Sequence, residues 1–495
     1  MNSEPDTSGY HGDRSALASA LASVLPKDAI LSAAEELTPY ECDGLSAYRS
    51  KPYIVVLPET VAQVQAVLKI CKRLQIPVVA RGAGTGLSGG ALPHERGVLL
   101  SLARFNRILG IDTDNNCAVV QPGVRNLAIS EAVSQYNLYY APDPSSQIAC
   151  TIGGNVAENS GGVHCLKYGL TVHNILSLKV LNFDGELLEI GSAALDAPGY
   201  DLLALMTGSE GLLGIIVEIT VKLLPKPDTT QVILAAFSDV ADAGKAVGDV
   251  IAAGIIPAGL EMMDNAAINA AEDFVHAGYP TDAAAILLCE LDGPEQDVDT
   301  QVQRVSDVLT TAGAHEVRVS HSEADKQRMW AGRKAAFPAV GRISPDYYCM
   351  DGTIPRHQLP SILTRISELS DEYGLRVVNV FHAGDGNLHP LILYDANIEN
   401  ELERTEELGS KILEACVAAG GTITGEHGVG MEKLDQMCIQ FGSAELQQFH
   451  AVKHAFDPDG LLNPGKAVPT LHRCAEFGAM HVHHGEVAFP DIERF

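Results

Sequence analysis

The sequence has ten cysteines among its 495 residues, but it contains no Cys-x-x-Cys pair and no spacing typical of an iron–sulfur cluster. Scattered thiols predict a reducing compartment and argue against a cluster bound by this chain. Residues 1–14 are polar and acidic and lack the apolar core of a signal peptide, and no later stretch is long and apolar enough for a membrane helix. We therefore expect no transmembrane segment and a cytoplasmic or peripheral protein.

Basic residues are also scarce. Lysine and arginine number 34 against 63 aspartates and glutamates, which gives a formal net charge of −29. Because nucleic-acid binding requires clustered positive charge, we expect no nucleic-acid partner. The length exceeds the size at which single cores stop growing, so at least two domains are expected.

Two short motifs in the second half carry side chains suited to a metal. His382-Ala-Gly-Asp-Gly-Asn-Leu-His389 lies between two β-rich runs, which predicts a hairpin with one histidine at each end of the turn. Downstream, Gly425-Glu426-His427-Gly428 adds a carboxylate and a third imidazole. Three such ligands suit a divalent transition metal (Zn, Mn, Fe or Co) and leave positions open, while His427 stays available for proton transfer. Alternatively, the histidines flank an ordinary polar turn and Glu426 pairs with a base.

Three glycine clusters lie in the first half: Arg81–Gly90, Ile152–Gly162 and Gly208–Gly214. The first matches the Gly-x-Gly-x-x-Gly dinucleotide fingerprint, but the run that follows it is typical of a strand, so we predict that it is not a Rossmann loop. If this cluster were the only one, we would interpret it as a glycine-rich hairpin bend. Three clusters together indicate a large ligand, such as a dinucleotide, that needs close approach of the backbone.

The pattern changes after Pro225. Strands and helices from Val232 to Ser320 follow the order β-α-β-β-α-β, which is a ferredoxin-like plan. We expect an N-terminal helical cap at 1–50, a ligand-binding domain at 51–227, a substrate and metal domain at 228–455, and a tail at 456–495 that returns to the first domain. In the ligand-binding domain, Thr60 and Gln63 predict the start of a helix through a capping box.

Residues 53–225 resemble the FAD-binding domain of the vanillyl-alcohol oxidase and p-cresol methylhydroxylase (PCMH) superfamily. The resemblance rests on the three glycine clusters, on Gln121-Pro122-Gly123-Val124 and on Lys167-Tyr168-Gly169. It implies an α+β fold in which a two-subdomain PCMH-type FAD-binding domain is joined to a ferredoxin-like substrate (cap) domain. It implies non-covalent FAD, because Thr85 stands where many members carry the histidine that attaches the flavin. The residues it implies for FAD binding are Arg81, Gly82, Gly84, Thr85, Gly86, Leu87, Ser88, Pro122, Gly123, Pro142, Gly153, Gly154, Asn155, Asn159, Gly162, Tyr168, Gly169, Glu210, Gly211 and Asn463.

The second half resembles the FAD-linked D-2-hydroxy-acid dehydrogenases. This resemblance implies that His382, His389 and Glu426 are metal ligands and that His427 is the catalytic base. A flavin beside a metal predicts oxidation of a hydroxylated carbon, and an arginine should hold the carboxylate of a 2-hydroxy acid. Arg333 is our candidate, since a planar guanidinium pairs with both carboxylate oxygens. The alternative is an exposed helix arginine.

Within this family, Asp346–Pro355 and the ending His472–His483 look most like the flavoprotein subunit of glycolate oxidases. The 2-hydroxyglutarate enzymes place a lysine where Cys349 stands, so we expect a smaller acid: glycolate first, D-lactate as the alternative. A non-catalytic flavin-binding subunit is a remote alternative. The resemblance also implies a second flavoprotein-like subunit and an iron–sulfur subunit that passes electrons to quinone at the inner membrane. His481, His483 and His484 could form a second metal site or a solvated segment.

Overall fold

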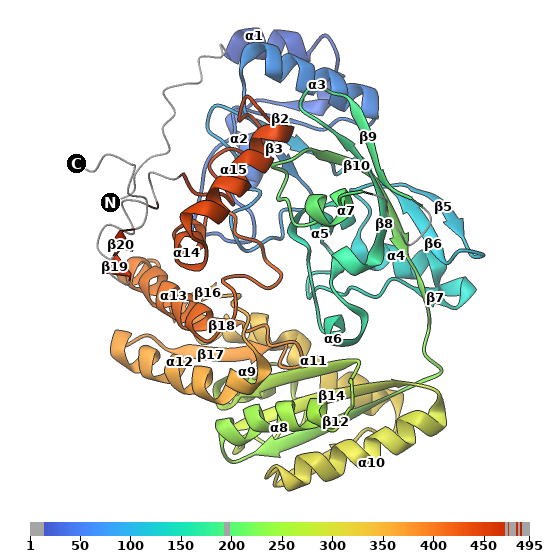
Figure 1. The fold of residues 1–495 in the computed structure, drawn as a ribbon, viewed down its shortest axis with the longest axis vertical. Coiled ribbons are helices and arrows are strands. Elements are labelled where there is room, and N and C mark those ends of the chain that lie inside the picture. The colour runs from blue at the N-terminus through green and yellow to red at the C-terminus, as the bar shows by residue number, and fades with distance from the viewer. Residues whose placement is uncertain (1–13, 193–198, 471–473, 475–481, 484–485, 488–495) are drawn as a thin grey trace. The chain divides into compact units, whose positions relative to one another are not determined.

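The computed structural model describes residues 14–192, 199–470, 474, 482–483 and 486–487, and the chain divides into two compact units. Unit 1 comprises Met1–Ser160, Leu170–Pro225 and His427–Phe495, and unit 2 comprises Gly161–Gly169 and Lys226–Glu426 (Figure 1). Most of the acidic N-terminal segment lies outside the described residues, as do His472, His481 and His484.

The first sheet of unit 1 has four strands in the order β1 (Ile30–Leu31), β2 (Ile54–Val56), β4 (Val98–Ser101) and β3 (Val78–Arg81). Helix α3 (Val61–Leu74) begins at the predicted capping box, where the Gln63 amide donates to Thr60 Oγ1 at 3.2 Å. Its apolar face packs in one core with α1 (Arg14–Leu21) and the sheet. Because β3 and β4 are parallel, the glycine-rich loop between them is not a hairpin bend.

The second sheet of unit 1 is antiparallel throughout and forms a separate core. Its order is β5 (Ile108–Asp112), β6 (Cys117–Val120), β10 (Ile215–Lys222), β8 (Ile175–Leu181) and β9 (Leu187–Gly191). The other elements of unit 1 are η1 (Lys27–Ala29), α2 (Ala34–Leu37), η2 (Thr38–Tyr40), α4 (Asn126–Val133), η3 (Ser134–Tyr136), β7 (Leu138–Tyr139), α5 (Ile152–Glu158), η4 (Thr171–Asn174), α7 (Leu202–Met206), β11 (Leu224–Pro225), α14 (Leu434–Gln440), α15 (Ser443–Phe456), β19 (Val482–His483) and β20 (Glu486–Val487).

Most of the second glycine cluster is helix α5, although its glycines suggest a loop. Gly153 lies in this helix, where a Cβ atom would stand only 2.4 Å from Pro122 Cβ. Close packing of the helix on Pro122 therefore explains this glycine without any need for a turn. Asn159 ends the helix in the left-handed conformation with φ 56°.

Unit 2 is built on one seven-stranded sheet in the order β15-β12-β14-β13-β17-β18-β16, in which all neighbours are antiparallel. The strands are β12 (Thr229–Phe237), β13 (Gly259–Asp264), β14 (Ala285–Gly293), β15 (Glu316–Val319), β16 (Asp346–Cys349), β17 (Val377–Phe381) and β18 (Pro390–Tyr394). The helices are α6 (Cys165–Tyr168), α8 (Val240–Ala252), α9 (Asn265–Val275), α10 (Glu295–Thr311), α11 (Glu323–Val340), η5 (Arg356–Gln358), α12 (Leu359–Tyr373) and α13 (Glu401–Ala418).

The first four strands of this sheet and helices α8 and α10 make the predicted ferredoxin-like arrangement, in which α8 and α10 pack on β12 and β14 (Figure 1). The α+β prediction is therefore confirmed. Two features were not predicted. Helix α9 follows β13, and Gly161–Gly169, expected within the FAD-binding domain, belongs to unit 2. Side chains of that segment bind β14: His164 Nε2 lies 3.0 Å from Glu290 Oε1, and the Tyr168 hydroxyl donates to Asp292 at 2.5 Å.

Candidate functional site

The two histidines of the hairpin face each other at its turn. Strands β17 and β18 pair as predicted, with Asn379 opposite Pro390, and the chain turns back through Gly386, whose φ is 84°. His382 and His389 are 3% and 2% exposed, and their ring centroids are 5.1 Å apart. The hairpin therefore brings together two imidazoles that are seven residues apart in sequence.

Glu426 lies between these two rings. Its Oε1 atom is 2.8 Å from His389 Nε2 and 3.3 Å from His382 Nε2. The three candidate ligand atoms lie within 4.8 Å of one another. Two imidazole nitrogens and a carboxylate oxygen that converge on one point are the donor set expected for a divalent transition metal.

The far nitrogens of both rings are held by acceptors on the protein. His382 Nδ1 lies 2.8 Å from Glu261 Oε1, and His389 Nδ1 lies 3.3 Å from the Met350 carbonyl oxygen. A proton on each Nδ1 satisfies these acceptors and leaves the Nε2 lone pairs directed at Glu426. This arrangement is typical of metal-binding histidines, whose second nitrogen is usually held in this way.

Asp351 shapes the loop that carries Glu426. This carboxylate is fully buried and accepts hydrogen bonds from Thr424 Oγ1 at 2.6 Å, from the Gly425 amide at 3.1 Å and from the Glu426 amide at 3.2 Å. Neither Asp351 nor Glu261 was predicted from the sequence. For Glu261 a signal was present, since it stands among apolar residues in the interior of strand β13, and such a carboxylate needs a buried partner.

The ligand cluster favours positive charge. Burial alone would raise the pKa of Glu426, but hydrogen bonds and charges from His382 and His389 hold it well below the usual value. Burial lowers the pKa of His389, but contacts with Cys349 and Glu426 raise it to about 10. The buried carboxylates therefore stabilise either protonated imidazoles or a cation that takes the place of those protons.

Arg333 is connected to the same cluster. It lies on α11 and is 2% exposed, which excludes the exposed helix arginine considered above. Its Nε donates to Glu261 Oε2 at 2.8 Å, so one carboxylate binds both Arg333 and His382. The Arg333 amide donates to the hydroxyl of Tyr279 at 3.0 Å, which fixes this turn of the helix.

His427 is the first residue of the C-terminal segment of unit 1. The amides of Val429 and Gly430 donate to the two carboxylate oxygens of Glu210, each at 2.7 Å. Glu210 itself has φ 50°, an uncommon conformation for a residue other than glycine. The side chain of Glu210, predicted to bind the cofactor, thus anchors the loop that directly follows His427.

The glycine loop after β3 offers accessible backbone between Gly82 and Leu87, whereas Ser88 to Gly90 are buried. A Cβ atom at Gly86 would meet no described atom closer than Glu158 Oε1 at 3.8 Å, so this part of the loop can be approached closely. Within the described residues, the buried hydroxyls of Ser88 and Thr151 have no hydrogen-bond partner. These features fit a bound dinucleotide, which needs close backbone approach and polar contacts.

Several of the other residues predicted for FAD binding hold this region of unit 1 together. Arg81 donates to the Cys42 carbonyl at 2.7 Å and lies directly against Gly84. The Asn463 side chain donates to the carbonyls of Gly90 and Glu210. Further hydrogen bonds join Gly153 to Pro122, Gly123 to Phe105, Asn126 to Pro142 and Asn155, and Val172 to Asn159. Gly162, Tyr168 and Gly169 belong to unit 2, while Thr85, Leu87, Gly154 and Gly211 lie in unit 1. Direct contacts of these residues with FAD stay a prediction.

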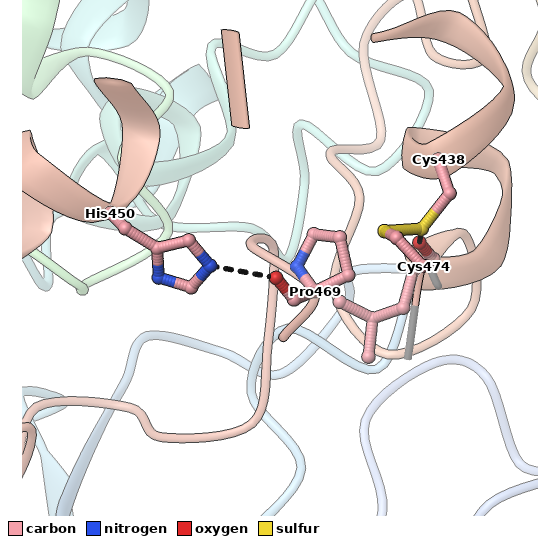
Figure 2. The surroundings of a disulfide bond; sticks show 5 residues. Cys438, His450, Pro469 and Cys474 are labelled. Atoms are coloured by element: carbon pink, nitrogen blue, oxygen red, sulfur yellow. Dashed lines mark hydrogen bonds between the residues drawn. A yellow bond between two sulfur atoms is a disulfide. The ribbon is translucent and has the colours of Figure 1, made fainter. Parts of the chain in front are cut away.

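A disulfide joins Cys438 on α14 to Cys474, with 5.3 Å between the Cα atoms (Figure 2). Nearby, His450 Nε2 lies 2.9 Å from the Pro469 carbonyl oxygen (Figure 2). The scattered spacing of the cysteines gave no sign of this pair. Among the described helices, none combines the length and apolar character that crossing a membrane requires.

Comparison with known proteins covers both halves of the chain. Residues 52–191 match the family model "FAD binding domain", and residues 226–467 match "FAD linked oxidases, C-terminal domain". The chain is 67% identical over 483 residues to the glycolate oxidase subunit GlcD of Escherichia coli K12, a match that covers 98% of this chain and 97% of that protein. It is 34% identical over 434 residues to a D-lactate dehydrogenase of Anaerostipes hadrus, covering 86% of this chain and 91% of that protein.

Solved structures show the same fold. The structure of p-cresol methylhydroxylase with substrate bound matches with a TM-score of 0.79 and 20% identity, covering 92% of this chain and 97% of that chain. A 4-ethylphenol oxidase from Gulosibacter chungangensis also gives a TM-score of 0.79, with 19% identity, covering 94% of this chain and 99% of that chain. At these identities the likeness concerns the fold alone. The family models and the relatives of higher identity establish that this chain is a member of the FAD-linked oxidases.

Proposed function

We propose that this protein oxidises glycolate to glyoxylate and is the flavoprotein subunit of a glycolate oxidase complex. The observation that carries the proposal is the 67% identity to a glycolate oxidase subunit over 98% of the chain. The convergent side chains of His382, His389 and Glu426 support it, because a non-catalytic flavin-binding subunit has no use for such a cluster.

In this proposal His382, His389 and Glu426 hold a divalent metal, and the glycine loops of unit 1 hold FAD without a covalent bond. When bound, the metal supplies a Lewis acid for the substrate hydroxyl, and FAD supplies the acceptor of a hydride. Arg333 pairs with the substrate carboxylate. The imidazole of His427 takes the hydroxyl proton as the Cα–H bond breaks, so the alcohol loses one proton and one hydride and becomes an aldehyde.

D-lactate is the second candidate substrate, because a D-lactate dehydrogenase is among the relatives. Cys349 favours the smaller acid: it is buried at the end of β16 and offers no charge for a second carboxylate. Reoxidation of the reduced flavin requires an electron acceptor outside this chain. We expect a second flavoprotein-like subunit and an iron–sulfur subunit that passes electrons to quinone, so that a cytoplasmic protein works at the inner membrane.

Anaerobic mixing of the purified flavoprotein with glycolate, D-lactate, L-lactate and D-2-hydroxyglutarate tests the proposal. We expect glycolate to bleach the oxidised flavin absorbance fastest, and dye-linked turnover should follow the same order. Faster reduction by D-lactate would replace glycolate as the substrate. A flavin that stays oxidised with every acid would point to a non-catalytic subunit.

A further inference from the structure

Glu261 lies at the junction of the two groups that the proposed reaction needs in unit 2. It is 1% exposed, and both of its carboxylate oxygens are engaged. Oε1 binds His382 Nδ1 at 2.8 Å, while Oε2 accepts from Nε of Arg333 at 2.8 Å and lies 2.8 Å from its Nη2. One carboxylate thus joins a candidate metal ligand to the candidate substrate arginine.

The register of the sheet produces this junction. Strand β13 pairs antiparallel with β17, and Met262 stands opposite Phe381. The next position along each strand places Glu261 opposite His382. The carbonyl of the preceding residue, Leu260, accepts from the Gly384 amide at 2.9 Å, which holds the histidine turn against β13. The contact is therefore set by the backbone of two strands and not by a mobile loop.

We propose that Glu261 is a positioning residue that couples metal binding to binding of the substrate carboxylate. It accepts the Nδ1 proton of His382 and so directs the Nε2 lone pair toward the metal. It also fixes the guanidinium through Nε and Nη2, and Nη1 of Arg333 stays outside this ion pair. The inference rests on the proposed function and adds to it a residue in neither motif.

Glutamine at this position tests the shared carboxylate. An amide offers one oxygen acceptor and one N–H₂ donor, so Glu261→Gln can serve His382 or Arg333 but not both. Glu261→Asp keeps the charge on a shorter side chain and provides a second variant if the glutamine protein folds poorly. Glu290→Gln is the matched control. Glu290, on the neighbouring strand β14, also binds a histidine ring nitrogen, at 3.0 Å from His164, and an N–H donor, at 2.6 Å from Trp330, but it contacts no candidate ligand.

The first measurement is the affinity of metal-stripped protein for Zn²⁺, obtained by competition with a chelator. We expect Glu261→Gln to bind Zn²⁺ about 10- to 100-fold more weakly than wild type, the usual effect of removing such a partner. Glu261→Asp should lie between the two, and Glu290→Gln should match wild type. Thermal melting of the metal-free proteins identifies any variant that fails to fold.

The second measurement is the KM for glycolate at saturating Zn²⁺. Excess metal should restore occupancy in Glu261→Gln, but the KM should stay about tenfold above wild type because Arg333 is no longer fixed. Equal Zn²⁺ affinity in wild type and both Glu261 variants, or equal loss in Glu290→Gln, would overturn the coupling. If wild type binds Zn²⁺ but does not oxidise glycolate, the proposed substrate fails while the metal arm of the test still decides the role of Glu261.

Discussion

Replacing Glu210 with glutamine disturbs the loop after His427 without touching the histidine itself. In the native protein both oxygens of Glu210 accept backbone N–H bonds at 2.7 Å, from Val429 and Gly430. A glutamine side chain has one acceptor, and its N–H₂ group would face the second backbone N–H. One buried backbone amide therefore loses its hydrogen-bond partner, which destabilises the native conformation of the loop.

The size of the effect follows from that lost bond. A buried N–H without a partner costs about 1–3 kcal/mol. If the native loop conformation is disfavoured by this amount, the fraction of molecules with His427 in place falls accordingly. Since each 1.36 kcal/mol corresponds to a factor of ten, we expect flavin reduction by glycolate to slow by roughly 5- to 150-fold.

Stopped-flow reduction under anaerobic conditions measures this rate, and metal analysis should show unchanged content, because the candidate ligands lie in unit 2. Asp457→Asn is the matched control. Asp457 also accepts two consecutive amides, from Leu461 at 3.2 Å and Leu462 at 2.7 Å, but it lies outside the His427 loop. A reduction rate for Glu210→Gln within twofold of wild type, or an equal loss in Asp457→Asn, would refute the positioning role.

Three further predictions concern other parts of the chain. His427→Ala should keep FAD and metal but slow flavin reduction by about 100-fold or more, the usual contribution of a general base; unchanged stopped-flow rates would remove His427 from that role. Glu426→Gln should lose metal and activity together, and full metal occupancy by elemental analysis would reject Glu426 as a ligand. Burial, with the charges of Lys466 and Arg96, lowers the pKa of His94 from 6.5 to about 4. As the pH falls from about 6.5 to 4, this histidine therefore binds a proton in the unfolded chain but not in the folded protein, which lowers the free energy of unfolding. His94→Gln should abolish about 1–2 kcal/mol of this loss, and urea unfolding at pH 7 and pH 4.5 measures it. An equal pH dependence in both proteins would contradict this assignment.

Elements with a strong local pattern could be predicted from the sequence. The capping box at Thr60, the ferredoxin-like order after Pro225 and the histidine hairpin all depend on residues close in sequence, and the structure contains each of them. Helix α5 was missed because its two glycines suggest a loop, although the first of them, Gly153, serves close packing on Pro122. The membership of Gly161–Gly169 in unit 2 could not be predicted, because it depends on partners in β14 more than 120 residues away.

The residues of the candidate site also fall into two groups, those that a local sequence pattern reveals and those that it does not. His382, His389, Glu426 and His427 stand in glycine-rich motifs whose composition indicates chemistry. Glu261 and Asp351 occupy no such motif, and they reach the candidate ligands only through the pairing of β13 with β17 and through the folding of the 424–426 segment onto Asp351. Strand register between distant segments is set by the whole sheet, so no short stretch of sequence reveals it. The candidate ligands and the candidate base could thus be picked out from the sequence, whereas the residues that hold them could not.

Those holding groups also set the charge of the site. Among the described residues, four carboxylates and two guanidinium groups lie in the histidine turn (382–389) or contact it and its bonded neighbours: Glu261, Asp351, Asp385, Glu426, Arg333 and Arg356. With both imidazoles neutral, four negative and two positive charges leave −2, which would repel the carboxylate of a hydroxy acid. A divalent cation held by the imidazoles and Glu426 brings this sum to zero, so an anionic substrate no longer meets net negative charge. The metal proposed here would therefore be needed for admitting the substrate as well as for activating its hydroxyl.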